Sequence, residues 1–249
     1  TGGVTAFVQL QDVRMFGEEF STLADYSADG LDMHQAWVEL TSDDAVWSVR
    51  VGRQEAAYGG ERLVGAVNWT QQARSFDGAR VRYRPTEEVW LDGFAFRIQD
   101  DDAPGFGGGD RSFYGVHTTL QEFDLELFGL LDTQNGVVDM DLATIGARWA
   151  TGREELTWRV EGAYQLGERT SGAVTTDRRA FMLGGRLGTE LTEDVGATLW
   201  YDYLSGDDDP GDDVVRVFDT LYATNHKFYG YMDLFLNIRS EEHTSELQS

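Results

Sequence analysis

Short segments in which polar and apolar residues alternate run along almost the whole chain. In residues 156–166, for example, Trp158, Val160 and Tyr164 share one parity, and Arg159 and Glu161 share the other. Alternation with a period of two predicts a β-strand whose two faces meet different surroundings. Eleven such strands are predicted, at residues 4–14, 31–41, 46–54, 75–84, 89–99, 112–120, 122–132, 140–150, 156–166, 178–188 and 195–205.

The connections between these segments alternate in length. The short connections are residues 42–45, 85–88, 121, 151–155 and 189–194, and the long ones are 15–30, 55–74, 100–111, 133–139, 167–177 and the chain after 205. Consecutive strands joined in this way predict an antiparallel up-and-down sheet with tight turns at one end and loops at the other. A transmembrane β-barrel of the outer membrane has this asymmetry, so the sequence favours an all-β fold of that type, with about eleven strands present.

The two parities of the predicted strands differ in a way that suits a membrane wall. Aromatic residues lie near strand ends on the apolar parity, where the interface girdles of such a barrel occur: Trp47, Tyr83, Trp149, Trp158, Tyr164, Tyr201 and Tyr203. Arginines occupy mid-strand positions on the polar parity: Arg50, Arg80, Arg82, Arg97, Arg148, Arg159 and Arg186. Asp77, Asp92 and Arg179 fall on the apolar parity and are exceptions to this pattern.

Composition narrows the classes of partner. The 249 residues include 44 acidic and 20 basic side chains, a formal charge of -24, which argues against nucleic acid because phosphate binding needs a basic surface. The chain has no Cys, and no apolar run approaches the ~20 residues of a membrane helix. Residues 239–249, RSEEHTSELQS, read like a translated sequencing adapter, so a non-native tail is expected there, after a partial barrel at 1–238.

The longest informative connection is the stretch 52–78, about twenty loop residues rich in Gly, Tyr, Trp and Arg. Its sequence contains GRQ at 52–54, YG at 58–59, ERLVG at 61–65, NW at 68–69 and RSFDG at 74–78. Together these motifs resemble the signature of the alginate-export family of outer-membrane barrels. Residues 218–235, FDTLYATNHKFYGYMDLF, are similar to a second stretch of that family, and residues 7–19 match it more weakly.

The resemblance implies an outer-membrane β-barrel that exports alginate or a similar acidic polysaccharide. Its barrel is larger than eleven strands, so closing strands are expected to be missing after about residue 238. An export signal is also expected to be absent from the start of this chain. The implied partners are outer-membrane lipid, an anionic polysaccharide or small anionic solute, and periplasmic secretion proteins.

A polyuronate carries a carboxylate on each sugar, and Arg binds carboxylates through a planar, bidentate fork. The seven mid-strand arginines are therefore predicted to line an aqueous substrate path, with the alternative that lumen acids such as Glu39, Asp124, Glu126 and Glu161 pair with them and only stiffen the wall. The 52–78 connection is predicted to fold into the pore as a constriction. The alternative is an external loop that clamps its neighbours, with Glu61 neutralising Arg62. The constriction residues are Arg53, Arg62, Asn68, Trp69, Arg74 and Asp77.

Other chemistry is weakly signalled. The acidic run Asp207–Asp213 could bind Ca²⁺ through carboxylates but lacks EF-hand spacing, and no metal site or cofactor is otherwise predicted. No HExxH, GxSxG or CxxC motif occurs, so an enzyme is not expected. Two alternatives to polyuronate export stay open: a general or solute-selective outer-membrane porin, and a soluble secreted β-sheet protein that binds polysaccharide.

Overall fold

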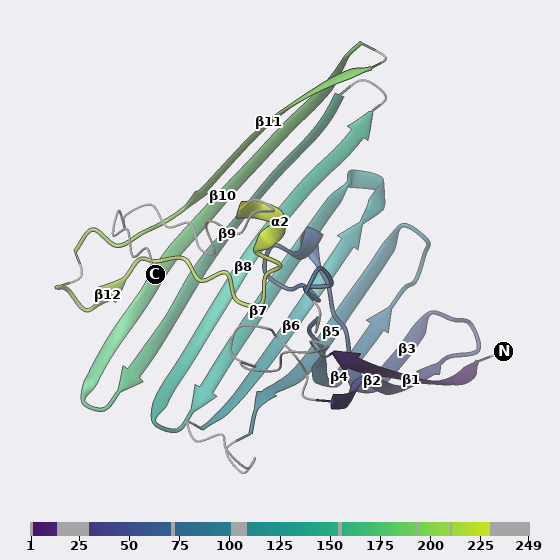
Figure 1. The fold of residues 1–249 in the computed structure, drawn as a ribbon, viewed down its shortest axis with the longest axis horizontal. Helices are drawn as coiled ribbons and strands as arrows, with labels where there is room; N and C mark the ends of the chain where they lie inside the picture. The colour runs from purple at the N-terminus through teal and green to yellow at the C-terminus, as the bar shows by residue number, and fades with distance from the viewer. Residues whose placement is uncertain are drawn as a thin grey trace.

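The computed structural model describes residues 2–13, 30–70, 73–100, 109–153, 156–192, 194–209 and 211–229. These residues form one sheet in which each strand from β1 to β11 lies beside the next along the chain, as Figure 1 shows. The strands are β1 (Gly3–Val13), β2 (Gly30–Thr41), β3 (Trp47–Gln54), β4 (Phe76–Tyr83), β5 (Val89–Gln99), β6 (Asp110–Leu120), β7 (Leu125–Asn135), β8 (Val138–Arg153), β9 (Leu156–Ser171), β10 (Val174–Thr192), β11 (Val195–Leu204) and the short β12 (Val214–Val215).

The sheet is an open, up-and-down wall. Every neighbouring pair from β1 to β11 is antiparallel, and β12 alone pairs in parallel, with β10. In the described part of the chain β1 and β11 are the two ends of the strand order, so the barrel is incomplete. The predicted all-β, antiparallel up-and-down barrel fold is therefore confirmed. Seven of the eleven predicted segments agree with the observed strands within two residues at each end, and the other four, which correspond to β7, β8, β9 and β10, differ by three to five residues at one end or both.

Two predicted loops are absent. Residues 133–139 and 167–177 contain tight hairpins, because β7 runs to Asn135 before β8 begins at Val138, and β9 runs to Ser171 before β10 begins at Val174. Gly136 and Gly172 take positive φ values of 145° and 63° in these two-residue turns. Beyond the apolar region these four strands have polar residues on both faces. The alternation therefore stops before the strands do, and the predicted strand ends came too early. The predicted loops 15–30 and 100–111 lie mostly outside the described residues, as does the tail at 239–249.

One face of the wall, called the outer face here, exposes large apolar side chains over many strands. Val51 on β3, Val116 on β6, Ile145 on β8, Val160 on β9 and Leu183 on β10 are all exposed there. On β9 the apolar positions run from Leu156 to Leu166, ten residues, which at about 3.3 Å per residue and a tilt of ~35–45° spans roughly 23–27 Å. That height matches the ~25 Å apolar band of an outer-membrane barrel.

The predicted aromatic residues lie on this outer face, several of them in cross-strand contact. Trp47 packs on Tyr83 with ring centroids 4.2 Å apart, and Trp149 meets Trp158 edge-on at 3.9 Å. Both pairs lie close to the end of the sheet that carries the short turns. Aromatic side chains with one apolar and one polar part are suited to the membrane–water interface.

The opposite, inner face is covered over part of its area by two chain segments. The first is the inner loop, described at residues 55–70 and 73–75, with the 3-10 turn η1 (Gly59–Glu61). The other is the second inner segment, described at residues 205–209 and 211–229, with α2 (His226–Tyr229). Leu63 and Val64 of the inner loop join Phe94, Phe113 and other inner-face residues in the largest apolar cluster. Figure 1 shows α2 in front of the middle strands of the sheet. A one-layer wall thus gains its buried core from chain that folds onto its inner side.

Candidate functional site

Six of the seven arginines predicted to line the lumen lie on the inner face. Arg50, Arg80 and Arg82 alternate with the outward Val49 and Val81, and the remaining three, on β8, β9 and β10, are Arg148, Arg159 and Arg186.

Arg97 is the exception, and its predicted place in the lumen is wrong. On β5 the buried positions are Asp92, Phe94 and Phe96, while Arg97 shares the outer parity with Leu91. Its guanidinium pairs with Asp110, which is also on the outer parity, at 3.1 Å. The aromatic parity of β5 faces inward because the inner loop packs there, so Asp92, an exception in the sequence pattern, lies on the inner face.

Most of the inner arginines contact an acid of the wall. Arg50 binds Glu39 at 2.9 Å, and Arg82 binds Asp92 through two hydrogen bonds of 2.6 and 2.7 Å. Arg148 pairs with Glu126, and Arg159 lies 3.6 Å from Glu161. These four ion pairs are of the kind expected if the acids of the lumen pair with the arginines and stiffen the wall. Asp124, one of the acids named for that role, lies in a turn and does not pair with them.

The strand register also sets arginines against each other. Arg50 lies directly opposite Arg80 on the neighbouring strand, and Arg159 lies directly opposite Arg186. Like charges directly opposite on adjacent strands destabilise a sheet. Arg186 is exposed to the inner side and stacks over Trp200 at 5.8 Å, without an ion pair in the described part of the chain. The inner face therefore keeps positive charge that its own acids do not neutralise locally.

Arg62 fixes the inner loop to the wall. Its guanidinium donates to Glu161 on β9 at 2.8 Å and to Asp202 on β11 at 2.7 Å, and only 4% of the Arg62 side chain is exposed. The ring of Phe228, from the second inner segment, lies 3.8 Å from the guanidinium carbon. Glu61, the neutralising partner that the external-loop alternative needs, instead accepts a hydrogen bond of 2.6 Å from Thr224. The inner loop thus lies against the inner face of the wall, and a loop that narrows the pore must lie on that face.

The two inner segments are joined by backbone hydrogen bonds. Gly65 N–H donates to the Tyr222 carbonyl, and Tyr222 N–H donates to the Leu63 carbonyl, both at 2.9 Å. Arg74 donates to the carbonyls of Gly65 and Tyr222, and burial lowers its pKa. A Cβ on Gly65 would overlap the Thr224 hydroxyl, so this position needs a glycine for the close approach. The two stretches that resemble the family signature are therefore in direct contact.

Sequence reasoning missed a second attachment of these segments to the wall. Asp132 on β7 is fully buried, accepts two hydrogen bonds from Arg111, at 3.0 and 2.5 Å, and lies 3.3 Å from the Tyr222 hydroxyl. Gln165 on β9 exchanges two hydrogen bonds of 2.8 Å with the backbone of Asp219. Asp132 and Gln165 occupy the polar parity of their strands, which was the available signal, but nothing in that parity identifies their partners.

The remaining predicted constriction residues separate into two groups. Asn68 and Trp69 lie in the turn that the Thr70 N–H to Val67 carbonyl bond closes, and Trp69 stacks on His226 with centroids 3.8 Å apart. Arg53 and Asp77 pair with each other at 2.8 Å on the outer face. Their predicted place beside substrate is therefore wrong, because the register aligns Arg53, Asp77 and Arg97 on the outward parity.

Several buried donors on the inner face lack a partner. Arg62 Nη1, Arg148 Nε and Arg159 Nε make no hydrogen bond among the described residues. Arg62 and Arg148 also line a small cavity between the inner loop and the wall, together with Tyr58 and Glu161. Burial and the nearby Asp92 carboxylate raise the pKa of the Tyr58 hydroxyl, so it stays a neutral donor. The cavity has a volume of about 20 Å³, enough for one water molecule, which these unused guanidinium donors can bind.

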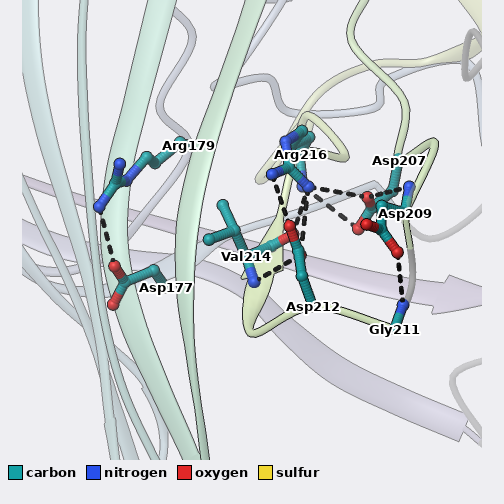
Figure 2. Close-up of polar contacts among 8 residues, drawn as sticks. All are labelled: Asp177, Arg179, Asp207, Asp209, Gly211, Asp212, Val214 and Arg216. Atoms are coloured by element: carbon teal, nitrogen blue, oxygen red, sulfur yellow. Dashed lines mark hydrogen bonds and ion pairs between the residues drawn. The ribbon is translucent and has the colours of Figure 1, made fainter.

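The acidic run 207–213 closes around a cation of its own chain. Arg216 donates to Asp212 at 2.7 Å and to Asp207 at 3.4 Å, and Asp209 accepts from the Gly211 N–H, as Figure 2 shows. Arg216 and the Val214 N–H lower the pKa of Asp212. Among the described residues no group of three metal-binding side chains is present. Two of the five aspartates of this loop are thus paired with Arg216, and the proposed Ca²⁺ site gains no support from these contacts.

Comparison with solved structures shows the fold of outer-membrane channels. OpdK of Pseudomonas aeruginosa, crystallised with vanillate, is 12% identical, with a TM-score of 0.55 over 83% of this chain and 57% of that one. OccK2 (OpdF) of the same organism is 12% identical, with a TM-score of 0.53 over 90% and 59%. Its complex with glucuronate gives 0.51 at 12% identity over 78% and 54%. The chain thus spans somewhat more than half the length of these barrels.

Comparisons at the level of sequence give the family. No relative among the curated proteins matches the chain. Within the described residues, no helix is long and apolar enough to cross a membrane. The family model for alginate export matches residues 2–241, which is nearly the whole sequence. The outer face exposes aliphatic side chains, as a surface in contact with lipid does. This protein belongs to the alginate export family and is located in the bacterial outer membrane.

Proposed function

We propose that this protein is an outer-membrane porin that passes an acidic polysaccharide, of the polyuronate class, along the arginines of its inner face. The observation that carries the proposal is the pair of opposed arginines, Arg50 with Arg80 and Arg159 with Arg186. A sheet that places like charges opposite each other loses stability. A passing carboxylate, which can accept from both guanidinium groups, removes that repulsion while it is bound.

The pairing of neighbouring arginines with wall acids fits transport better than tight binding. Conduction needs sites that attract the ion but release it. Glu39 beside Arg50 and Glu161 beside Arg159 reduce the local charge, so that each opposed pair is a weak carboxylate site. The glucuronate bound to OccK2 is a single uronic acid in a barrel of this fold.

The inner loop is proposed to narrow this path. It follows β3 in the chain and lies along the inner face, where Arg62 binds Glu161 on β9 and Asp202 on β11. A loop in that position reduces the cross-section through which a chain of sugars moves. Guanidinium groups line the wall beside the loop, so the constriction would admit anionic sugars more readily than neutral ones.

The test uses the protein with its complete barrel in a planar bilayer. Arg80→Gln with Arg186→Gln removes one arginine from each opposed pair, and we expect added polyuronate to block the anion current about tenfold less strongly per arginine, since a charge-assisted hydrogen bond contributes about 1.5–3 kcal/mol. Arg179→Gln removes one positive charge from the outer face and should leave the block unchanged. Equal block in all three proteins would refute the arginine path.

A second candidate is a solute-selective porin for single organic acids. It is favoured by the vanillate and glucuronate complexes of the structural neighbours, each with one small acid. The same bilayer experiment separates the two functions, because a polymer of uronic acid should block at much lower concentration than its monomer only if several carboxylates bind at once. We propose no catalytic role, since the family and fold are those of transport proteins.

A further inference from the structure

The outer face changes character near the loop end of the sheet. The register aligns one row of outward positions across neighbouring strands, and this row is polar: Arg53, Asp77, Arg97, Ser112, Thr133, Asp141, Glu168 and Asp177. The next outward row towards the short turns is apolar over most of its length, with Val51, Ala95, Tyr114 and Leu131. The row does not lie at one height, because its distance from the short-turn end grows from six residues on β3 to eight on β5 and fifteen on β10. On β5, Arg97 comes two residues after Ala95, the last outward apolar residue of that strand, so its guanidinium lies near the edge of the apolar band.

Arg97 is the exposed cation of this row on β5. Its side chain is 47% exposed, and one Nη pairs with Asp110 at 3.1 Å. Exposed ion pairs of this kind contribute only about 0–1 kcal/mol, so the guanidinium can donate to another anion at little cost. At the membrane edge that anion is the phosphate of a lipid, which an arginine binds through its planar fork.

A hollow in the apolar surface lies directly below Arg97. It has a volume of about 450 Å³, and outward side chains of Tyr114, Val116, Leu131 and Ile145 surround it. Its floor is formed where two glycines, Gly93 and Gly129, face outward, and a Cβ on either would meet no atom within 4 Å. A volume of this size is typical of ligand sites.

The hollow opens towards lipid and not towards the lumen. On the inner side of the same strands, a Cβ on Gly115 would overlap Phe94 and Leu130, so that side is filled. Val116 and Ile145 are both well exposed on the outward side. The hollow is therefore a groove in the membrane-facing surface.

The cation and the groove lie on one strand at a distance that fits a lipid. Arg97 and Gly93 are four residues apart on β5, which corresponds to about 13 Å along an extended strand. We propose that this surface binds a phosphate-bearing lipid of the outer leaflet, with its phosphate on Arg97 and an acyl chain in the groove over Gly93 and Gly129. The proposal requires only the membrane location, and so it goes beyond the transport function and does not depend on it.

The test measures lipid bound to the complete barrel protein in detergent, by native mass spectrometry, with lipid A as the probe in its phosphorylated and dephosphorylated forms. We expect the wild type to prefer the phosphorylated form. Arg97→Gln should bind that form about fivefold more weakly, the usual contribution of one arginine near an anionic headgroup, and should no longer distinguish the two. Gly93→Leu with Gly129→Leu fills the groove and should weaken both forms equally.

Two matched controls lie on β10, away from the groove. Arg179→Gln removes an exposed outward cation that pairs with Asp177 at 3.1 Å (Figure 2), and Gly185→Leu adds a side chain at another open outward glycine. Both should retain wild-type binding. Equal binding of the two lipid forms by the wild type, or the same loss in the controls, would overturn the proposal. So would a dimer that the groove-filling variant dissociates, since the occupant would then be a second copy of the chain.

Discussion

Replacing Arg62 with Ala tests whether one side chain holds the inner loop on the wall. In the wild type, Arg62 bridges Glu161 at 2.8 Å and Asp202 at 2.7 Å, and no more than 10% of any of the three side chains is exposed. The variant removes the cation nearest to two nearly buried carboxylates, and only Arg159, 3.6 Å from Glu161, remains beside one of them. Removing one partner of a buried ion pair typically destabilises the arrangement by about 3–5 kcal/mol.

The cost is relieved if the inner loop leaves the wall, because water then reaches both carboxylates. Since about 1.4 kcal/mol changes an equilibrium tenfold, the ratio of docked to released loop should fall by roughly 150- to 5,000-fold. Leu63 and Val64, both buried, still oppose release, and each contributes about 1.5–3 kcal/mol. The loss and the remaining apolar contribution are of similar size, so the released state should become well populated while the wall stays folded.

Amide hydrogen exchange measures this release directly. The N–H groups of Gly65 and Tyr222 donate across the contact between the two inner segments, and their protection should fall in Arg62→Ala by about the factor given above. Amides in the middle of β8 and β9 should keep their protection. In a bilayer, the open-channel conductance of the complete barrel should rise, because the loop no longer narrows the path.

A rescue variant separates the electrostatic explanation from a general packing defect. Arg62→Met combined with Glu161→Gln and Asp202→Asn removes all three charges and retains similar volumes, so we expect protection at Gly65 and Tyr222 to return towards the wild-type value. If Arg62→Ala left the exchange of both amides unchanged, the loop would be held by its apolar contacts alone, and the argument from the buried ion pairs would be wrong.

Three further changes probe the same region and the acidic loop. Asp132→Asn removes the buried charge beside the Tyr222 hydroxyl. Amide exchange in the second inner segment should become several-fold faster, and the exchange rates of the β7 amides should stay the same. Gly65→Ala forces a Cβ into a side-chain oxygen of that segment and should lower the thermal midpoint by several degrees, whereas alanine at an open outer-face glycine should not. The Arg216 contact lowers the pKa of Asp212, so its stabilising effect is fully present above pH 4 and is lost as the pH falls through the lowered pKa. The Val214 N–H, which donates to Asp212, should therefore lose its protection against amide exchange only in acid.

Strand existence and order could be predicted from the sequence because each strand repeats the same contrast between lipid and lumen. Trp158, Val160 and Tyr164 are outward and Arg159 and Glu161 inward, as the alternation of residues 156–166 indicates. Strand length could not be predicted in the same way. Beyond the membrane both faces of β9 and β10 meet water, the alternation fades, and only backbone pairing, which leaves no mark on composition, continues to the turn at Gly172.

The error at Arg97 shows what alternation leaves undetermined. A period of two separates the faces of a strand, but it does not say which face is the lipid side. Apolar residues mark the lipid side only where the lumen side is wet. On β5 the inner loop makes the lumen side dry, so Phe94 and Phe96 face inward and Arg97 is left on the membrane side, where Leu91 and Ala95 are the modest apolar residues. Asp92 was the signal in the sequence that this face is the inner one. A buried carboxylate among aromatic residues needs a cationic partner, and Arg82 can be that partner only if the aromatic face of β5 points to the lumen. Wherever a charged residue interrupts the more aromatic parity of a barrel strand, an inward-folded loop should therefore be sought before the arginines of that strand are assigned to the pore.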